Sequence, residues 1–200
     1  MKRICVFCGS SPGARPEYVL AAKELGMLLA RKKIGLVYGG ARVGMMGALA
    51  TAAVEAGGEV IGVMPGSLVK KEVAHTGLKD LRIVETMHER KALMSELSDG
   101  FVALPGGLGT IEEFFEVLTW AQLSMHKKPC GLLNVNGYFD PLVTFIDHAV
   151  AQQFVSPASR SLVILENTPE KLLQKFEHYE APQSDKASWA LRMSDKLAGI

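Results

Sequence analysis

The chain has 200 residues, 48% of them hydrophobic, so it is long and apolar enough to fold as one domain around a sizeable core. Its 22 lysine and arginine residues nearly balance 21 aspartate and glutamate residues, which leaves a formal net charge of +1. A nucleic-acid polymer would need a concentrated cationic face, and no long basic block is present, so a small ligand is the expected partner.

Short apolar runs alternate with helical patterns along the whole chain. In chain order, the pattern predicts strands over residues 3–8, 34–40, 59–65, 81–85, 100–107, 129–135 and 161–166. Between and after them it predicts amphipathic helices over 17–32, 45–57, 87–98, 109–124, 140–154 and 169–179. Continuous Val, Ile and Leu strands between such helices are typical of a parallel sheet covered on both faces. The predicted fold is therefore α/β: a doubly wound, Rossmann-like parallel sheet in three α/β/α layers.

We expect a single domain over residues 1–180. After it, residues 181–200 begin as a polar, turn-rich segment. Trp189, Met193 and Leu197 then fall at i, i+4 and i+8, so this tail is either a short docking helix or a partly ordered end. The sequence contains no internal repeat and no sign of a second domain.

The N-terminal sequence MKRICVFCGSSPG has an apolar run too short for a signal peptide, and no stretch is long enough to span a bilayer. Three cysteines that need not pair suit a reducing compartment, so a cytoplasmic location is expected. Cys5 and Cys8 lie three apart on a predicted strand and should point to opposite faces, so they are interpreted as core packing. The five histidines show no metal-ligand spacing, and no metal site is predicted.

Three loops that contain glycine follow predicted strands, at residues 8–13, 38–47 and 104–110. Ligands of a doubly wound sheet bind where the carboxyl ends of strands lead into helices. None of the three loops matches a standard nucleotide fingerprint. The pattern G-x-G-x-x-G would need a glycine where the chain has Glu112, and G-x-x-x-x-G-K-[ST] does not occur.

The loop over 104–110 favours a phosphate site. Gly106, Gly107 and Gly109 lie between a buried strand and a helix start, whose first N–H groups lack internal partners. Partial positive charge there, together with missing Cβ atoms, lets a phosphate approach the backbone, and Thr110 adds a hydroxyl group. The alternative is that the glycines only form a tight turn.

Glu113 follows this loop on the predicted helix. It shares a helix stripe with Val117 and Trp120, so it should lean inward at the mouth of the phosphate site. Because carboxylates repel phosphates, a carboxylate there needs a role beyond binding. The alternative is a capping box, Thr110-x-x-Glu113, in which both side chains satisfy backbone donors.

Arg90, on the preceding helix, is also predicted to face inward. It shares a stripe with Leu93, Met94 and Leu97, and an inward arginine usually pairs with an anion. That anion is either a ligand or the partner in a structural salt bridge. Lys91 is one position off the stripe, where a lysine is more often solvated.

The segments MHERK (87–91) and PGGLGTIEE (105–113) together resemble the paired signature of the LONELY GUY family. Members of that family are cytokinin riboside 5′-monophosphate phosphoribohydrolases, and many carry an old "lysine decarboxylase" label. The resemblance runs from VFCGSS to GLLNVNGYFDPLVTFIDHAV and therefore covers most of the chain up to about Phe154.

The resemblance implies hydrolysis of the N-glycosidic bond of a nucleoside 5′-monophosphate, either a cytokinin riboside 5′-monophosphate or AMP or both, with no metal or cofactor. Arg90 and Glu113 match the family's catalytic arginine and glutamate. Family members are usually dimers and some are larger, so a homodimer or higher homo-oligomer is expected. The residues expected to bind or line the substrate cleft are Gly106, Gly107, Leu108, Gly109, Thr110, Glu112, Lys91, Glu72, Ser10, Gly39 and Gly40.

The implied chemistry agrees with the residue types. Breaking a ribosyl C–N bond builds positive charge on the sugar, and a carboxylate can stabilise that cation and deprotonate water. Arg90 either holds the substrate or holds Glu113 ionised by lowering its pKa.

Three other functions fit less well. A lysine decarboxylase would need pyridoxal phosphate on a Schiff-base lysine, yet Lys70, Lys71, Lys127 and Lys128 lie in polar segments without a distinctive setting. A dinucleotide oxidoreductase would need a glycine fingerprint where the first loop has GSSPG.

Molybdenum-cofactor carrier proteins resemble this family in fold and bind a phosphorylated pterin without hydrolysis. They are the non-enzymatic alternative, which the presence of both Arg90 and Glu113 disfavours. The base preference stays open, because apolar pockets discriminate only modestly between ligands of different size.

Overall fold

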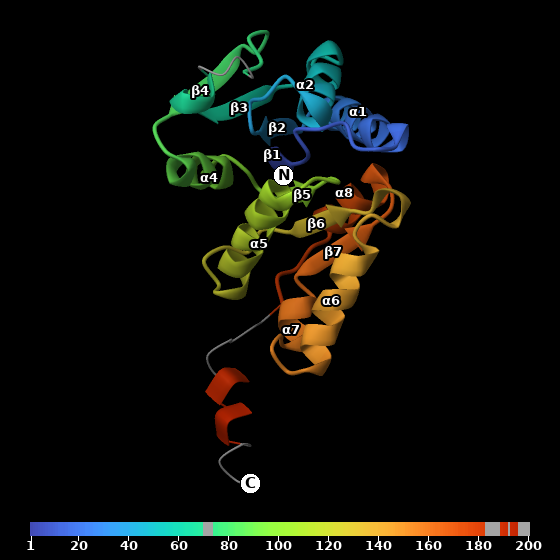
Figure 1. Cartoon of the computed structure of the whole chain (residues 1–200), viewed down its shortest axis with the longest axis vertical. Helices are drawn as coiled ribbons and strands as arrows, with labels where there is room; N and C mark the ends of the chain where they lie inside the picture. The colour runs from blue at the N-terminus through green and yellow to red at the C-terminus, as the bar shows by residue number, and fades with distance from the viewer. Residues whose placement is uncertain (70–73, 183–188, 192, 196–200) are drawn as a thin grey trace.

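The computed structural model describes residues 1–69, 74–182, 189–191 and 193–195. Seven strands form one all-parallel sheet in the order β4-β3-β2-β1-β5-β6-β7 (Figure 1). All seven predicted strands are confirmed, each one to five residues shorter than or shifted from the apolar run that predicted it. The strands are β1 (Arg3–Phe7), β2 (Gly35–Tyr38), β3 (Val60–Pro65), β4 (Asp80–Val84), β5 (Phe101–Ala103), β6 (Cys130–Leu133) and β7 (Val163–Glu166).

The six predicted helices are present as well. Three shorter elements were not predicted, because three or four residues are too few to show a helical period. These are α3 (Gly66–Val69), the 3-10 turn η1 (Val135–Gly137) and α7 (Pro157–Arg160). The predicted helices are α1 (Pro16–Arg31), α2 (Gly44–Glu55), α4 (Met87–Glu96), α5 (Leu108–Gln122), α6 (Asp140–Ala151) and α8 (Pro169–Glu177).

Helices cover both faces of the sheet, so the three-layer prediction is confirmed. Side chains alternate along β1: Ile4 and Val6 join the core formed with α1, α2 and α8, whereas Phe7 joins the core formed with α4, α5 and α6. Cys5 and Cys8 are buried in these two different cores, as expected for packing residues. The sheet is therefore apolar on both sides, and polar chemistry is confined to its ends.

Helices α1 and α2 lie unusually close together on their face of the sheet. Gly26 of α1 faces α2, and a Cβ atom at that position would overlap the backbone carbonyl of Leu49. Such a close approach requires glycine.

Within the described part of the chain, no helix is both long and apolar enough to cross a membrane. Nor does any cluster of histidine, cysteine and acidic side chains among these residues have the arrangement of a metal site. In the tail, residues 189–191 and 193–195 are helical, while Leu197, the third member of the predicted stripe, lies outside the described residues.

Candidate active site

A cavity of about 300 Å³ opens at the carboxyl ends of β1 and β5. These two strands are neighbours at the point where the strand order reverses, with β2 to β4 on one side and β6 and β7 on the other. This switch point is where doubly wound sheets bind ligands. The residues that line the cavity are Cys8, Gly9, Ser10, Met46, Met87, Arg90, Gly107, Leu108, Gly109, Thr110, Glu112 and Glu113.

Helix α4 aims Arg90 into the protein. The hydroxyl oxygen of Thr86 accepts a hydrogen bond from the N–H of Glu89 (3.1 Å), which fixes the start of this helix. One turn further on, Arg90 is only 7% exposed, as its stripe predicted. Its Nε donates to the carbonyl of Val63, within β3 (3.1 Å). The guanidinium is thus held by main chain on one side and is available to an anion on the other.

That anion is Glu113. Nη1 of Arg90 donates to Oε1 of Glu113 at 2.8 Å, and both side chains are nearly buried. Burial raises the pKa of Glu113 above the ordinary glutamate value, and the positive charge of Arg90 offsets only part of this effect. The sequence suggested that Arg90 lowers this pKa. It does pull in that direction, but removal from water outweighs it.

The capping-box alternative for Glu113 is wrong. Helix α5 starts one residue earlier than predicted, and its N-cap is Gly107, which offers no side chain. Thr110 is therefore already inside the helix, where it is buried. The carboxylate of Glu113 is engaged with Arg90 and not with the helix start.

The glycine loop leaves space in front of the start of α5. A Cβ atom built on Gly107 or Gly109 would meet no atom within 4 Å, and neither residue has a positive φ. Neither packing nor a turn thus requires glycine at these two positions, so the tight-turn alternative does not account for them. A Cβ there would instead fill space where an anion could approach the N–H groups. Gly106 differs, because its Cβ would overlap Thr110.

The two glycines after β2 have structural settings. A Cβ on Gly39 would overlap Nη2 of Arg90, so this glycine makes room for the guanidinium. Gly40 has a φ of 76° and packs against Leu81 and Met64, away from the residues that line the cavity. Ser10 lies in the cavity lining as expected, while Glu72 falls outside the described residues.

Lys91 does not project freely into solvent, which corrects the sequence interpretation. Its ammonium group contacts Glu112 at 2.7 Å and Glu116 at 3.0 Å, both on α5, and its side chain is 12% exposed. Hydrogen bonding to Glu112 is the main reason why its pKa is raised. Three cation–carboxylate contacts, one from Arg90 and two from Lys91, therefore join α4 to α5 at the mouth of the cavity.

Sequence reasoning missed four residues of the cavity lining: Cys8, Gly9, Met46 and Met87. Met46 belongs to the glycine-bearing segment 38–47, which follows a strand, and this position in the sequence could have identified it as a lining residue. Burial raises the pKa of Cys8 well above that of an ordinary thiol, so this side chain stays protonated and is a poor nucleophile.

The described cavity lining offers no lysine for a pyridoxal phosphate Schiff base. Lys91, the nearest along the chain, is held by two carboxylates, and its pKa is raised, whereas a Schiff-base lysine needs a lowered one. The residues present do not fit this cofactor.

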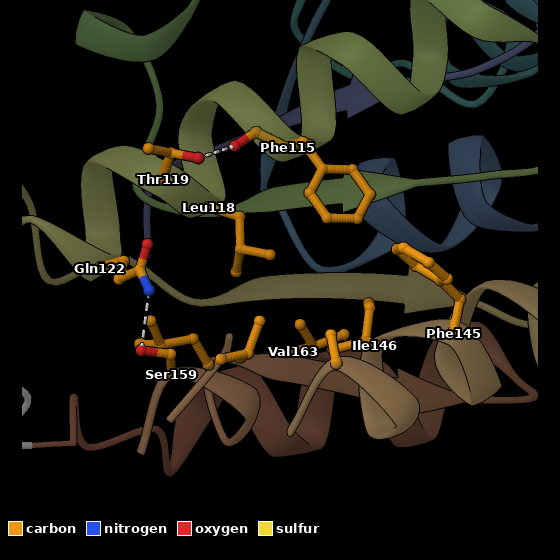
Figure 2. Close-up of a pocket in the computed structure, with 11 residues that line it drawn as sticks. Phe115, Leu118, Thr119, Gln122, Phe145, Ile146, Ser159 and Val163 are labelled. Atoms are coloured by element: carbon orange, nitrogen blue, oxygen red, sulfur yellow. Dashed lines mark hydrogen bonds between the residues drawn. The ribbon is translucent and has the colours of Figure 1, made fainter. Parts of the chain in front are cut away.

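A second cavity, of about 160 Å³, lies elsewhere, between α5, α6 and the start of β7 (Figure 2). Figure 2 shows Phe115 and Phe145 on facing helices, with Leu118 and Ile146 beneath them. At its far end Nε2 of Gln122 donates to Oγ of Ser159 at 3.0 Å. Apart from Thr119, Gln122 and Ser159, its described lining residues are apolar, and none of them is charged.

Fold and cavity together define an α/β protein of the Rossmann-like class with a charged cleft at the switch point of its sheet. Residues 46–176 match a family model described as "Possible lysine decarboxylase". Over 165 residues the chain is 55% identical to a cytokinin riboside 5′-monophosphate phosphoribohydrolase from Rhodococcoides fascians, covering 82% of this chain and 83% of that one. Over 187 residues it is 47% identical to a protein of the same name from Arabidopsis thaliana, covering 94% and 87% of the two chains. The chain belongs to the LONELY GUY family.

Solved structures support the fold. A molybdenum cofactor binding protein from Rippkaea orientalis superimposes with a TM-score of 0.68 at 24% identity, over 89% of this chain and 97% of that one. The molybdenum cofactor carrier protein from Chlamydomonas reinhardtii gives 0.67 at 23% identity, over 88% and 96%. At this identity the likeness extends to the fold alone.

Proposed function

We propose that this chain hydrolyses the N-glycosidic bond of a nucleoside 5′-monophosphate to a free base and ribose 5-phosphate. Cytokinin riboside 5′-monophosphate, AMP or both are its substrates. The observation that carries the proposal is the buried ion pair between Arg90 and Glu113 beside the open start of α5. The printed names of the curated relatives agree with this activity.

The substrate phosphate would bind at the start of α5. The N–H groups at this helix end carry partial positive charge, and Gly107 and Gly109 leave room for the phosphate oxygens. The hydroxyl of Thr110, which also lines the cavity, supplies a further donor. Binding through main-chain N–H groups is independent of the base and suits any 5′-monophosphate.

Glu113 would act at the ribose. Its carboxylate faces the same cavity as the phosphate loop, so it can lie beside C1′ once the phosphate is bound. As the bond from C1′ to the base nitrogen breaks, its electron pair leaves with the base and C1′ gains oxocarbenium character. The carboxylate stabilises this cation and accepts a proton from the attacking water, whose oxygen forms the new bond to C1′. The departing base nitrogen takes up a proton to complete the free base.

Arg90 would orient Glu113 and keep part of its population ionised. With Nε bound to the carbonyl of Val63, the guanidinium has a fixed position from which Nη1 holds one carboxylate oxygen. The second carboxylate oxygen is then directed toward the cavity. This arrangement suits a group that must be partly desolvated and still act as a base.

A product assay on the purified protein tests the proposal. AMP, isopentenyladenosine 5′-monophosphate and unphosphorylated adenosine are incubated with wild type and with Glu113→Gln, and free base is followed by chromatography. Base release from the two monophosphates by wild type alone is the expected result, and the ratio of the two rates gives the base preference. Binding of nucleotides by wild type without any base release would instead favour a phosphorylated-ligand carrier.

The same proposal includes a homo-oligomer, at least a dimer, in the cytoplasm. The apolar cavity between α5 and α6 (Figure 2) lies in a region where Phe145 is 65% exposed and Phe154 is 83% exposed, and large exposed apolar groups of this kind mark contact surfaces. Three buried free thiols suit a reducing compartment. Light scattering on wild type and Phe145→Glu tests the oligomer: a dimer that the variant loses supports it, and a monomeric wild type refutes it.

A further inference from the structure

Tyr138 contacts the glycine loop from another cavity, next to the catalytic one. Its hydroxyl donates a hydrogen bond of 2.6 Å to the backbone carbonyl of Gly106. This second cavity, of about 430 Å³, is lined by Tyr138, Gly106 and Gly107, whereas Arg90 and Glu113 line only the catalytic one. Gly107 lines both cavities, so the loop lies where the two meet, and Tyr138 holds it from the second one.

The position of Tyr138 is itself fixed by its neighbours in the chain. It follows η1, in which Asn136 and Gly137 both have positive φ values, of 52° and 71°. Immediately after it, the N–H of Phe139 donates to Oδ1 of Asn134 (2.8 Å), whose Nδ2 donates to Asp140 (2.8 Å). This network closes the turn between β6 and α6, so the tyrosine is presented by a rigid support.

The ring of Tyr138 is held as well. It makes edge contacts with Tyr18 at 5.6 Å and with Phe139 at 5.1 Å between ring centroids. Such pairs contribute beyond simple apolar burial. Only the hydroxyl of Tyr138, and not that of Tyr18, is bonded to the glycine loop.

The consequence for the loop follows from the planarity of the peptide bond. In a trans peptide, the carbonyl of one residue and the N–H of the next point in opposite directions. Since the carbonyl of Gly106 points at Tyr138, the N–H of Gly107 points away from Tyr138, and Gly107 lines the cavity that also holds Glu113. Within the described chain this N–H has no backbone partner, and it is therefore available to a ligand.

A peptide between two glycines has little intrinsic preference for one orientation, because both flanking residues reach most of φ/ψ space. If the plane of the Gly106–Gly107 peptide were flipped, the carbonyl oxygen would take the place of the N–H, and this oxygen would repel the anion. Gly106 and Gly107 have no side chains with which to hold this orientation, so an external group has to do so.

We propose that Tyr138 is a positioning residue, whose hydroxyl holds the Gly106–Gly107 peptide with its N–H toward the substrate phosphate. This inference deepens the proposed function and rests on it for the identity of the phosphate as that of a nucleoside monophosphate. It assigns Tyr138 to phosphate binding, through Gly107, and not to the glycosidic bond.

The test compares Tyr138→Phe with Tyr18→Phe, two variants that each remove one hydroxyl from the same aromatic pair. Binding of ribose 5-phosphate is measured by titration calorimetry, which needs no turnover, and KM and kcat are measured separately. For Tyr138→Phe we expect the Kd for ribose 5-phosphate and the KM to rise about tenfold, equivalent to about 1.4 kcal/mol. We expect kcat to change by less than about twofold, because the lost interaction is made equally in ground and transition states. Tyr18→Phe should keep wild-type values.

Three results would overturn the proposal: an unchanged Kd in Tyr138→Phe, an equal loss in both variants, or a fall in kcat with Kd intact. An unchanged Kd would mean that the loop does not need the hydroxyl. An equal loss in both variants would mean that ring packing causes the effect, and a fall in kcat alone would assign Tyr138 to the chemical step. Absence of base release from any nucleotide by wild type would refute the proposed function. The calorimetric comparison would still decide the role of Tyr138.

Discussion

Gly39 lies against the guanidinium of Arg90 so closely that a Cβ on residue 39 would overlap Nη2. The glycine that follows β2 therefore determines where the arginine of α4 can lie. Because Arg90 in turn holds Glu113, the ion pair forms only if residue 39 has no Cβ atom.

Gly39→Ala should therefore act as a mutation of the ion pair. We expect the displaced guanidinium to release Glu113, and kcat/KM for the nucleotide to fall at least about tenfold, equivalent to about 1.4 kcal/mol of transition-state stabilisation. Gly66→Ala is the matched control, since its new Cβ would make only ordinary contacts. Steady-state kinetics on both variants checks this, and wild-type kinetics in Gly39→Ala would show that Arg90 has another place to go.

Glu113→Gln removes the proposed base and keeps its shape. The amide oxygen can still accept from Arg90, so binding of ribose 5-phosphate should stay near the wild-type value. We expect kcat to fall by about 10²–10⁴-fold, the range attributed to a general base. Glu116→Gln, on the same helix and paired with Lys91, is the control carboxylate. A kcat within tenfold of wild type would exclude Glu113 from the chemistry.

The pH dependence of the reaction should report the buried carboxyl. The pKa of Glu113 is raised by burial, so its ionised, active form is lost as pH falls through a value above that of an ordinary glutamate. Arg90 lowers this pKa, so its replacement in Arg90→Gln should raise the pKa further and move the acid limb of kcat to higher pH. Both pH profiles are measured on the same substrate, so titration of its phosphate affects them equally. An acid limb that stays in place or moves to lower pH contradicts the assignment.

Gly109→Ala should stabilise the folded protein and weaken its binding of the substrate. The new methyl group meets no protein atom, and alanine restricts the unfolded chain more than glycine does, so we expect a gain of about 0.4–1 kcal/mol in the free energy of unfolding. The same methyl group narrows the space before the helix start, so the KM for nucleoside monophosphates should rise. Urea unfolding and kinetics on one preparation measure both effects. Loss of stability would mean that the space is not open, and an unchanged KM would place the phosphate elsewhere.

Gly26→Ala is the opposite case of the same substitution. Here the new Cβ would overlap the carbonyl of Leu49 and force α1 away from α2, which typically lowers the free energy of unfolding by about 1–3 kcal/mol. Because neither Gly26 nor Leu49 lines the catalytic cavity, KM and kcat should change little. Thermal unfolding checks the first part, and a variant as stable as wild type would show that the two helices can separate freely.

Local periodicity was sufficient for the sheet, the long helices and the inward direction of two charged side chains. Arg90 and Glu113 each lie on an apolar stripe of their own helix, and such a stripe faces the core in any α/β fold. What periodicity could not provide was their contact with each other, because the distance between two helices depends on how both pack on the sheet. Lys91 illustrates the limit: its stripe predicted solvent, and two carboxylates from α5 enclose it instead.

The glycines mark a second limit. In the sequence Gly39, Gly106 and Gly107 are alike, yet one makes room for a guanidinium, one for Thr110, and one leaves a space unfilled. These differences lie in the neighbours that a Cβ would meet, which belong to distant parts of the chain. The sign of the shift in the pKa of Glu113 has the same origin, since burial is a property of the assembled fold.

The phosphate would be held by main-chain atoms, and the glycosidic bond would be attacked by a side chain. Mutation can readily replace a carboxylate, but it cannot delete a peptide N–H without introducing proline. A single substitution at residue 113 would thus lower turnover by about 10²–10⁴-fold and leave a protein that still captures phosphorylated ligands. Under the proposed function, ligand capture would depend on the backbone and hydrolysis on one side chain, so capture would persist where hydrolysis is lost.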